Sequence, residues 1–159
     1  ALKLAALLVA LGDRAQGVED DLRLSAREVK QVAGAIAAAR ALADRDPTAG
    51  APSRLEAHRY FRAYGEAGVA GAVLSLAIAE GARAARREVA ARLLRAWFAE
   101  REDVVDPPPL VSGREVMEAL GIAPGRGVGQ ALEALREAQA QGLVRTREEA
   151  LACLRERNT

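Results

Sequence analysis

The sequence predicts an all-α protein, with a helical body domain over residues 1–102, a proline-rich linker over residues 103–109 and a small helical tail domain over residues 110–159. Val and Ile show no sustained alternation of the kind that a strand requires, so we expect no sheet. Four Ser/Thr-x-x-Glu patterns, each a capping box that marks a helix N-terminus, begin at Ser25, Ser53, Ser112 and Thr146. The three prolines at 107–109 predict the division, because consecutive prolines cannot lie inside a helix.

Composition excludes several classes of protein. Of the 159 residues, 50% are apolar and 28% are charged, which is ordinary for a globular domain. The single cysteine, Cys153, excludes an internal disulfide and a cysteine-based zinc site. No apolar run reaches membrane-spanning length and no signal peptide is visible, so we expect a cytoplasmic protein with no membrane partner. Because the chain begins at Ala1 and not at Met, we expect a fragment of a longer protein.

The body domain is expected to contain a series of helices. Residues 2–11 show a buried-helix pattern that stops at Gly12. A helix from Ser25 to about Leu42 has an apolar face at helical spacing, formed by Val29, Val32, Ala33, Ile36 and Ala37. The helix that begins at Ser53 is expected to end near Gly65.

Two more helices are expected in the body. Gly68 and Gly71 flank the start of one, which should pack through Val69, Val73, Leu74, Leu76 and Ile78 and break or kink at Gly81. The other covers residues 82–101, with an apolar stripe of Val89, Leu93, Ala96 and Trp97 and with Arg83, Arg86 and Arg87 on its polar side.

The tail is expected to fold as helix, glycine turn, helix, short turn and helix. The first helix begins at Ser112 and ends at Gly121, and a loop over residues 122–129 leads to a helix over residues 130–141 that Gly142 ends. The last helix begins at Thr146. Three of its residues are expected to face the interior: Ala150, Leu151 and Leu154.

No residue of the chain forms a recognisable catalytic or metal-binding motif. His58 is the only histidine, and no His, Asp and Glu cluster at ligand spacing surrounds it, so we interpret it as a partly buried polar residue. Cys153 has no nearby histidine to activate it. We therefore expect no catalytic residue and no metal ligand here.

The glycine loop of the tail is the strongest candidate for binding. Gly125, Gly127 and Gly129 permit a tight turn and a close approach to the backbone. The helix that follows offers unpaired N–H groups at its positive end, which suits a phosphate, and Arg126 lies beside them. The alternative is a helical hairpin in which the glycines only permit close packing of helices. The loop lacks the Gly-Lys-Ser/Thr ending of a P-loop.

The basic residues of the body are a second candidate. Net charge is only +1, but residues 51–102 carry nine basic and six acidic groups. Arg83, Arg86 and Arg87 fall on one side of a helix and could contact RNA, although a charged helix face is usually only solvated.

Several segments together resemble a known family. In the tail these are PLVSGREVM (109–117), GIAPG (121–125), EAQ (137–139) and TREEAL (146–151), and in the body YFR (60–62), GEAG (65–68) and LSLA (74–77). The combination is similar to the C-terminal body and tail of the bacterial tRNA nucleotidyltransferase/poly(A) polymerase family, the class II CCA-adding, CC-adding and A-adding enzymes. The resemblance covers residues 53–154 well and the first 50 residues loosely.

The resemblance implies an RNA-binding role without chemistry. In that family a head carries the catalytic carboxylates, which use Mg²⁺ with ATP or CTP, and body and tail hold the tRNA elbow. This chain has no Gly-Gly-x-x-Arg-Asp motif, so the head is expected to be a missing partner and no cofactor is expected here. The resemblance implies tRNA contacts from Gly125 to Gly129 and from Arg126.

Two other functions stay open at this stage. The tail could dock on a protein through a face of Val116, Leu120 and Leu132, or its loop could bind DNA as a helix-hairpin-helix does.

Overall fold

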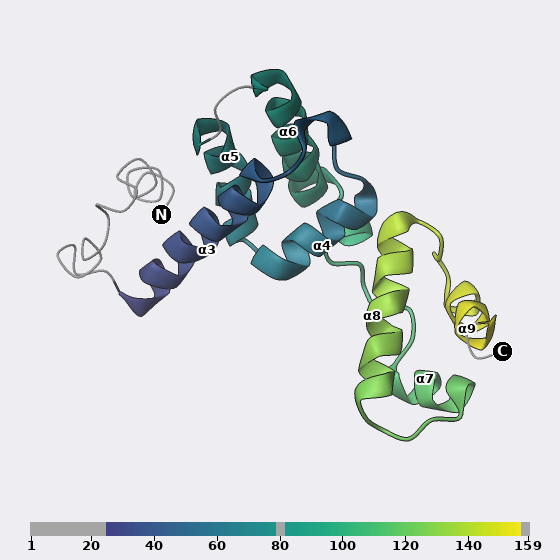
Figure 1. Cartoon of the computed structure of the whole chain (residues 1–159). Helices are drawn as coiled ribbons and strands as arrows, with labels where there is room; N and C mark the ends of the chain where they lie inside the picture. The colour runs from purple at the N-terminus through teal and green to yellow at the C-terminus, as the bar shows by residue number, and fades with distance from the viewer. Residues whose placement is uncertain (1–24, 79–81, 157–159) are drawn as a thin grey trace. The chain divides into compact units, whose positions relative to one another are not determined.

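The computed structural model describes residues 25–78 and 82–156, and every regular element within these ranges is a helix, as the sequence predicts (Figure 1). Two compact units divide the chain between Phe98 and Ala99. The domain boundaries expected at residues 102 and 110 stay a prediction. The helix expected over residues 2–11 and the break expected at Gly81 lie outside the described residues. None of the described helices is both long and apolar enough to cross a bilayer.

The first unit contains four α-helices and a 3₁₀ turn: α3 (Ala26–Ala43), η2 (Pro47–Ala49), α4 (Arg54–Tyr64), α5 (Ala67–Ile78) and α6 (Arg83–Ala99). Two of these helices, α3 and α4, begin with the capping boxes that the sequence predicts. The Ser53 hydroxyl accepts a hydrogen bond from the Glu56 N–H at 3.2 Å, and the Glu56 carboxylate accepts one from the Ser53 N–H at 2.8 Å. This N–H and the Arg45 guanidinium lower the pKa of Glu56 to about 2. Ser25 and Glu28 make the same box on α3.

Helices α3 and α5 pack closely because both present small residues. A Cβ atom added to Gly71 would lie only 2.4 Å from the Cβ of Ala38 and 3.1 Å from the carbonyl oxygen of Ala35. Real Cβ atoms do not approach so closely, so the backbones could not keep this spacing with a larger residue at position 71. Ala35 and Ala38 are accordingly fully buried.

This packing corrects the face predicted for α3. Val32 is buried as predicted, but Ala33 and Ala37 are exposed and Val29 and Ile36 are only half-buried. The buried residues are Val32, Ala35, Ala38, Ala39 and Leu42. The face is rotated because the glycines of α5 select the alanines of α3 as contacts, and residue size along α3 alone does not reveal that partner.

Helices α5 and α6 follow their predictions in part. On α5, Leu74 is buried, but Val73 and Leu76 remain 37% and 39% exposed, contrary to the expectation that they pack. On α6 the predicted stripe is confirmed, since Val89, Leu93 and Ala96 are buried. Trp97 completes that stripe, with its ring 4.9 Å from that of Phe61.

The second unit contains a π-helix, η3 (Arg101–Val105), followed by α7 (Gly113–Leu120), α8 (Arg126–Gln141) and α9 (Arg147–Glu156). Its core is formed by Val111, Val116, Leu135, Val144, Ala150 and Leu154. Ala150 and Leu154 are buried as predicted, and Leu151, which was also predicted to face inward, is partly buried against this core. Gly121 and Gly142 end α7 and α8 in the left-handed conformation, with φ of 64° and 77°, as predicted.

The segment expected to be an extended spacer is partly helical and packed. Val104 and Val105 lie in η3 and are buried. Irregular backbone begins only after them, at the prolines 107–109. There the Gln139 side-chain amide donates a hydrogen bond to the Pro108 carbonyl at 2.9 Å, so α8 holds the proline segment in place.

Candidate functional site

The glycine loop leads directly into α8, which begins at Arg126 and not near Gln130 as predicted. Gly127 and Gly129 therefore belong to its first turn, although glycine disfavours a helix by about 1 kcal/mol relative to alanine. Tertiary packing outweighs that preference, because Val128 between them packs against the tail core. Arg126 is consequently the first residue of the helix.

The N-terminus of α8 lacks the caps that its neighbours carry. Its N-cap residue is Gly125, no side chain caps it, and no acidic residue lies in its first turn. In α7 the Ser112 N–H donates to the Glu115 carboxylate at 2.7 Å, and in α9 the Thr146 N–H donates to Glu149 at 3.2 Å. The positive end of α8 is thus left without an anionic partner from its own first turn.

Packing does not account for the glycines of this turn. A Cβ atom added to Gly129 would meet nothing within 4 Å, and one added to Gly127 would make only an ordinary contact, 3.5 Å from Ile122 Cδ1. Gly125 also has open space but needs glycine for its backbone, with φ of 157°. Close packing of helices therefore does not explain the glycine at position 129. Because Gly129 has no side chain, the helix backbone is exposed at this position.

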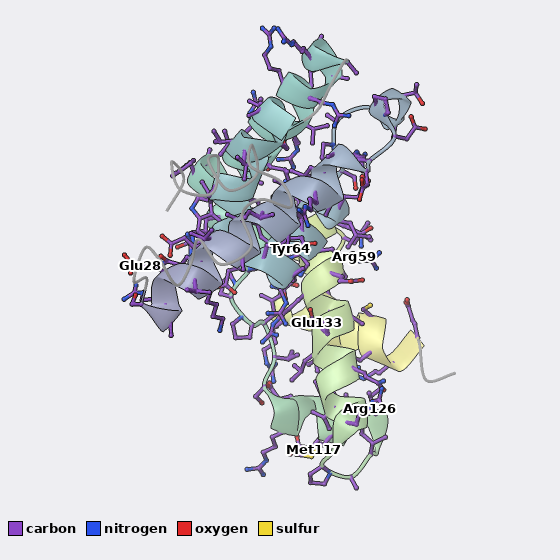
Figure 2. The ribbon with its side chains drawn as sticks, turned by 60° about the vertical axis from the view of Figure 1, so that its left-hand side comes forward. Glu28, Arg59, Tyr64, Met117, Arg126 and Glu133 are labelled. Atoms are coloured by element: carbon purple, nitrogen blue, oxygen red, sulfur yellow. The ribbon has the colours of Figure 1, made fainter. Side chains whose placement is uncertain are left out.

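Arg126 lies at the end of α8 near α7, with Glu133 farther along the same helix (Figure 2). It is exposed, and no hydrogen bond or ion pair holds it among the described residues. Other arginines of this unit are engaged: Arg114 pairs with Glu118 at 3.0 Å, and Arg147 Nη2 lies 2.5 Å from Glu115. Arg126 can therefore reach an anion at the helix end without breaking a bond.

At the start of α7, the carboxylate of Glu115 occupies the position in which an anion would bind a helix N-terminus. Hydrogen bonds from the N–H and hydroxyl of Ser112, and then from Arg147, lower the pKa of Glu115 to about 2. The carboxylate is therefore ionised at neutral pH and fills the anion position of α7. No described residue fills the matching position of α8.

The three predicted arginines of the body have different environments. Arg83 and Arg87 are exposed on α6, one turn apart. Arg86 is half-buried and donates hydrogen bonds to the carbonyls of Leu42 and Ala43 at 3.3–3.4 Å, which satisfies the C-terminal end of α3. Sequence reasoning missed this role because the partners lie more than forty residues away in the chain.

His58 and Cys153 were considered for metal binding or catalysis, and they differ in burial. His58 is 1% exposed, more deeply buried than predicted. Cys153 is half-buried against the tail core. Over the described ranges, no group of three or more His, Cys, Asp and Glu residues could hold a metal ion.

The face suggested for a protein partner is used within the tail itself. Val116 is fully buried, and Leu120 and Leu132 pack against the same core. Of this face only Val116 is fully buried, while Leu120 and Leu132 are partly buried, so the apolar surface on which that alternative depended is reduced.

Comparison with known proteins identifies relatives with named activities. The chain is 52% identical over 58 residues to the A-adding tRNA nucleotidyltransferase of Deinococcus radiodurans, which covers 36% of this chain and 13% of that protein. It is 54% identical over 57 residues to the CC-adding tRNA nucleotidyltransferase of Thermus thermophilus, covering 33% of this chain and 13% of the relative. A CC-adding enzyme of Geobacter sulfurreducens is 56% identical over 41 residues, or 26% of this chain and 10% of the relative.

These matches span only a small part of each relative's length. No solved structure matches the chain. A family described as tRNA nucleotidyltransferase domain 2, putative, matches residues 1–154. The chain therefore belongs to this family, the C-terminal region of class II CCA-adding enzymes, and the resemblance seen in the sequence is confirmed.

Proposed function

We propose that this chain binds tRNA by the shape and charge of its backbone and transfers no nucleotide itself. The observation that carries the proposal is the start of α8. No side chain caps this helix end, and its first turn contains no acidic residue. Gly129 leaves the helix backbone there without a side chain and with open space around it. A helix N-terminus of this kind suits a phosphate group. Membership of a tRNA nucleotidyltransferase family supports tRNA as the source of that phosphate.

In this proposal the first turn of α8 contacts the RNA backbone. The N–H groups of Gly125, Arg126 and Gly127 face a phosphate, and Gly129 allows the sugar-phosphate chain to approach the helix surface. The Arg126 guanidinium pairs with a phosphate oxygen, as arginine does at such sites. Duplex RNA is recognised mainly through phosphates and 2′-hydroxyls, so little base reading is needed.

Arginines of the body supply further phosphate contacts. Arg83 and Arg87 are exposed and suited to this role. Arg86, also predicted as a contact from the sequence, contributes mainly by holding the end of α3 in our proposal, because its hydrogen bonds already occupy it.

The nucleotide transfer named for the relatives belongs, in our proposal, to a catalytic head outside this chain. That head would be the partner that uses Mg²⁺ with ATP or CTP. The present chain would act in the cytoplasm by holding the tRNA while the head works.

The test is direct binding to fluorescently labelled tRNA, measured by anisotropy over a range of salt concentrations. Neutralising phosphates releases counterions, so log K should fall linearly and steeply with log salt. A chain that does not bind tRNA even at low salt contradicts the proposal.

Duplex DNA at equal salt is the matched control. Binding that favours tRNA supports recognition of RNA shape. Equal or tighter binding to duplex DNA would instead support the helix-hairpin-helix function.

A further inference from the structure

Helix α5 carries apolar side chains on all sides, and part of its surface is exposed. Its only polar side chain is Ser75, whose buried hydroxyl donates a hydrogen bond to the Ala72 carbonyl at 2.8 Å. A helix that is apolar all round is normally buried on all sides. One side of α5 packs on α3, but Val73 and Leu76, three residues apart, are 37% and 39% exposed. This face therefore offers apolar surface to a partner.

The same part of the first unit contains a hollow with an exposed aromatic ring beside it. The hollow has a volume of about 540 Å³ and is lined by residues of α3, α5 and α6 and by Glu66, which precedes α5. Val73, Trp97 and Phe98 form apolar parts of its wall. Phe98 is 74% exposed. Aromatic side chains are enriched in protein–protein interfaces relative to the rest of the surface, so this region has the composition of an interface.

A surface that holds both a hollow and an exposed ring can pair with a copy of itself. In a dimer with two-fold symmetry the same patch of both copies meets, and every contact occurs twice. Phe98 of one copy can then enter the hollow of the other copy, while the second Phe98 enters the hollow of the first. Both contacts bury aromatic surface, which contributes strongly to the stability of interfaces.

Two opposite charges fit the same symmetric arrangement. Glu66 is exposed and is the only charged residue among the described residues that line the hollow. Arg95 is exposed on α6 three residues before Phe98 and so lies on the same face of that helix. Among the described residues, no hydrogen bond or ion pair holds the side chain of Glu66 or Arg95. When Phe98 enters the opposite hollow, Arg95 can therefore meet Glu66 of the other copy.

We propose that the chain forms a symmetric dimer through its first unit, in which Phe98 fills the hollow of the other copy and Arg95 pairs with Glu66 across the interface. Charge complementarity favours a second copy over an unrelated apolar partner, because the chain itself carries both charges of the pair. The interface uses residues of the first unit alone, so it does not depend on RNA binding by α8.

The mass of the full chain in solution tests this interface, measured by sedimentation velocity over a dilution series that begins in the high micromolar range. The wild type should change from the mass of two chains to that of one on dilution. Phe98→Asp should have the mass of one chain throughout, because a carboxylate would be desolvated in the apolar hollow. Leu143→Asp is the matched control, since Leu143 is 70% exposed in the second unit, and it should dimerise as the wild type does. A wild type with the mass of one chain at every concentration, or a Phe98→Asp variant that still dimerises, would overturn the proposal.

An exchange of charges tests the reciprocal contact without changing the apolar wall of the hollow. Glu66→Arg and Arg95→Glu should each raise the dissociation constant of the dimer about tenfold or more, because like charges would then face each other at two places. The double variant should regain the affinity of the wild type, and so should an equimolar mixture of the two single variants, because opposite charges are then paired at both places. Circular dichroism checks that each variant keeps its helices. Failure of both the double variant and the mixture to recover dimerisation would also overturn the proposal.

Discussion

Helices α5 and α8 both contain glycines where a helix would prefer alanine, but for different reasons. In α5 an added Cβ would lie 2.9 Å from the Tyr60 ring at Gly68 and 2.4 Å from Ala38 at Gly71. In α8 an added Cβ at Gly129 would meet nothing within 4 Å. The glycines of α5 serve packing inside the protein, whereas Gly129 has no internal purpose.

The difference separates the glycines that helix packing requires, Gly68 and Gly71, from Gly129, to which we assign a role in binding. A glycine inside a helix costs about 1 kcal/mol relative to alanine. In α5 the close approach of α3 requires glycine in spite of that cost. At Gly129 an alanine would avoid the cost without meeting another atom, so packing gives no reason for glycine there. In our proposal the approach of the RNA backbone gives that reason.

The largest effect is expected from Gly71→Ala. Its Cβ would overlap Ala38, and overpacking of a tight core usually costs about 1–3 kcal/mol. Urea unfolding followed by circular dichroism should show a lower free energy of unfolding by that amount. An unchanged midpoint would mean that α3 and α5 do not approach as closely as described.

Arg126→Ala should have the next largest effect, on binding and not on stability. Loss of one charged hydrogen bond should weaken tRNA binding by about 1–2 kcal/mol and reduce the salt slope by about one. Anisotropy titrations at several salt concentrations measure both quantities.

Arg114→Ala is the matched control for that experiment. Its side chain is 84% exposed but already pairs with Glu118, and such surface pairs contribute little. A loss of affinity equal to that of Arg126→Ala would contradict a specific contact at the start of α8.

The capped start of α7 can be compared with the bare start of α8 by changing pH. Because the pKa of Glu115 is lowered to about 2 in the folded protein, its stabilising effect is full above the ordinary value near 4.5. That effect is lost as the pH falls from there to about 2.

Glu115→Gln should therefore be less stable than the wild type at pH 7 and should lose less stability over that acid range. Urea unfolding between pH 7 and pH 2 measures both effects, with Glu118→Gln as the control that leaves the cap intact. Equal acid sensitivity of Glu115→Gln and wild type would show that the Glu115 cap does not govern this unit.

Local signals in the sequence predicted the local features of the fold. All four capping boxes, at Ser25, Ser53, Ser112 and Thr146, form as predicted, because they depend on residues only three positions apart. Helix ends at glycine were predicted for the same reason. The resemblance of the tail motifs to a known family was confirmed by the family match.

Features that depend on distant partners could not be predicted in this way. The rotated face of α3 results from the glycines of α5, and the role of Arg86 results from the carbonyls of Leu42 and Ala43. The early start of α8 depends on packing of Val128 against the tail core. Whether Gly125, Arg126, Gly127 and Gly129 bind RNA stays a prediction.

The substitution Gly129→Ala tests most directly whether the absence of a side chain at position 129 of α8 allows the RNA backbone to approach the helix. Alanine fits the free protein without a contact, so the free energy of unfolding should rise by about 0.5–1 kcal/mol. The new methyl group would stand between helix and RNA, so tRNA affinity, measured by anisotropy on the same sample, should fall. A variant that is more stable and binds tRNA as tightly as the wild type would contradict our account.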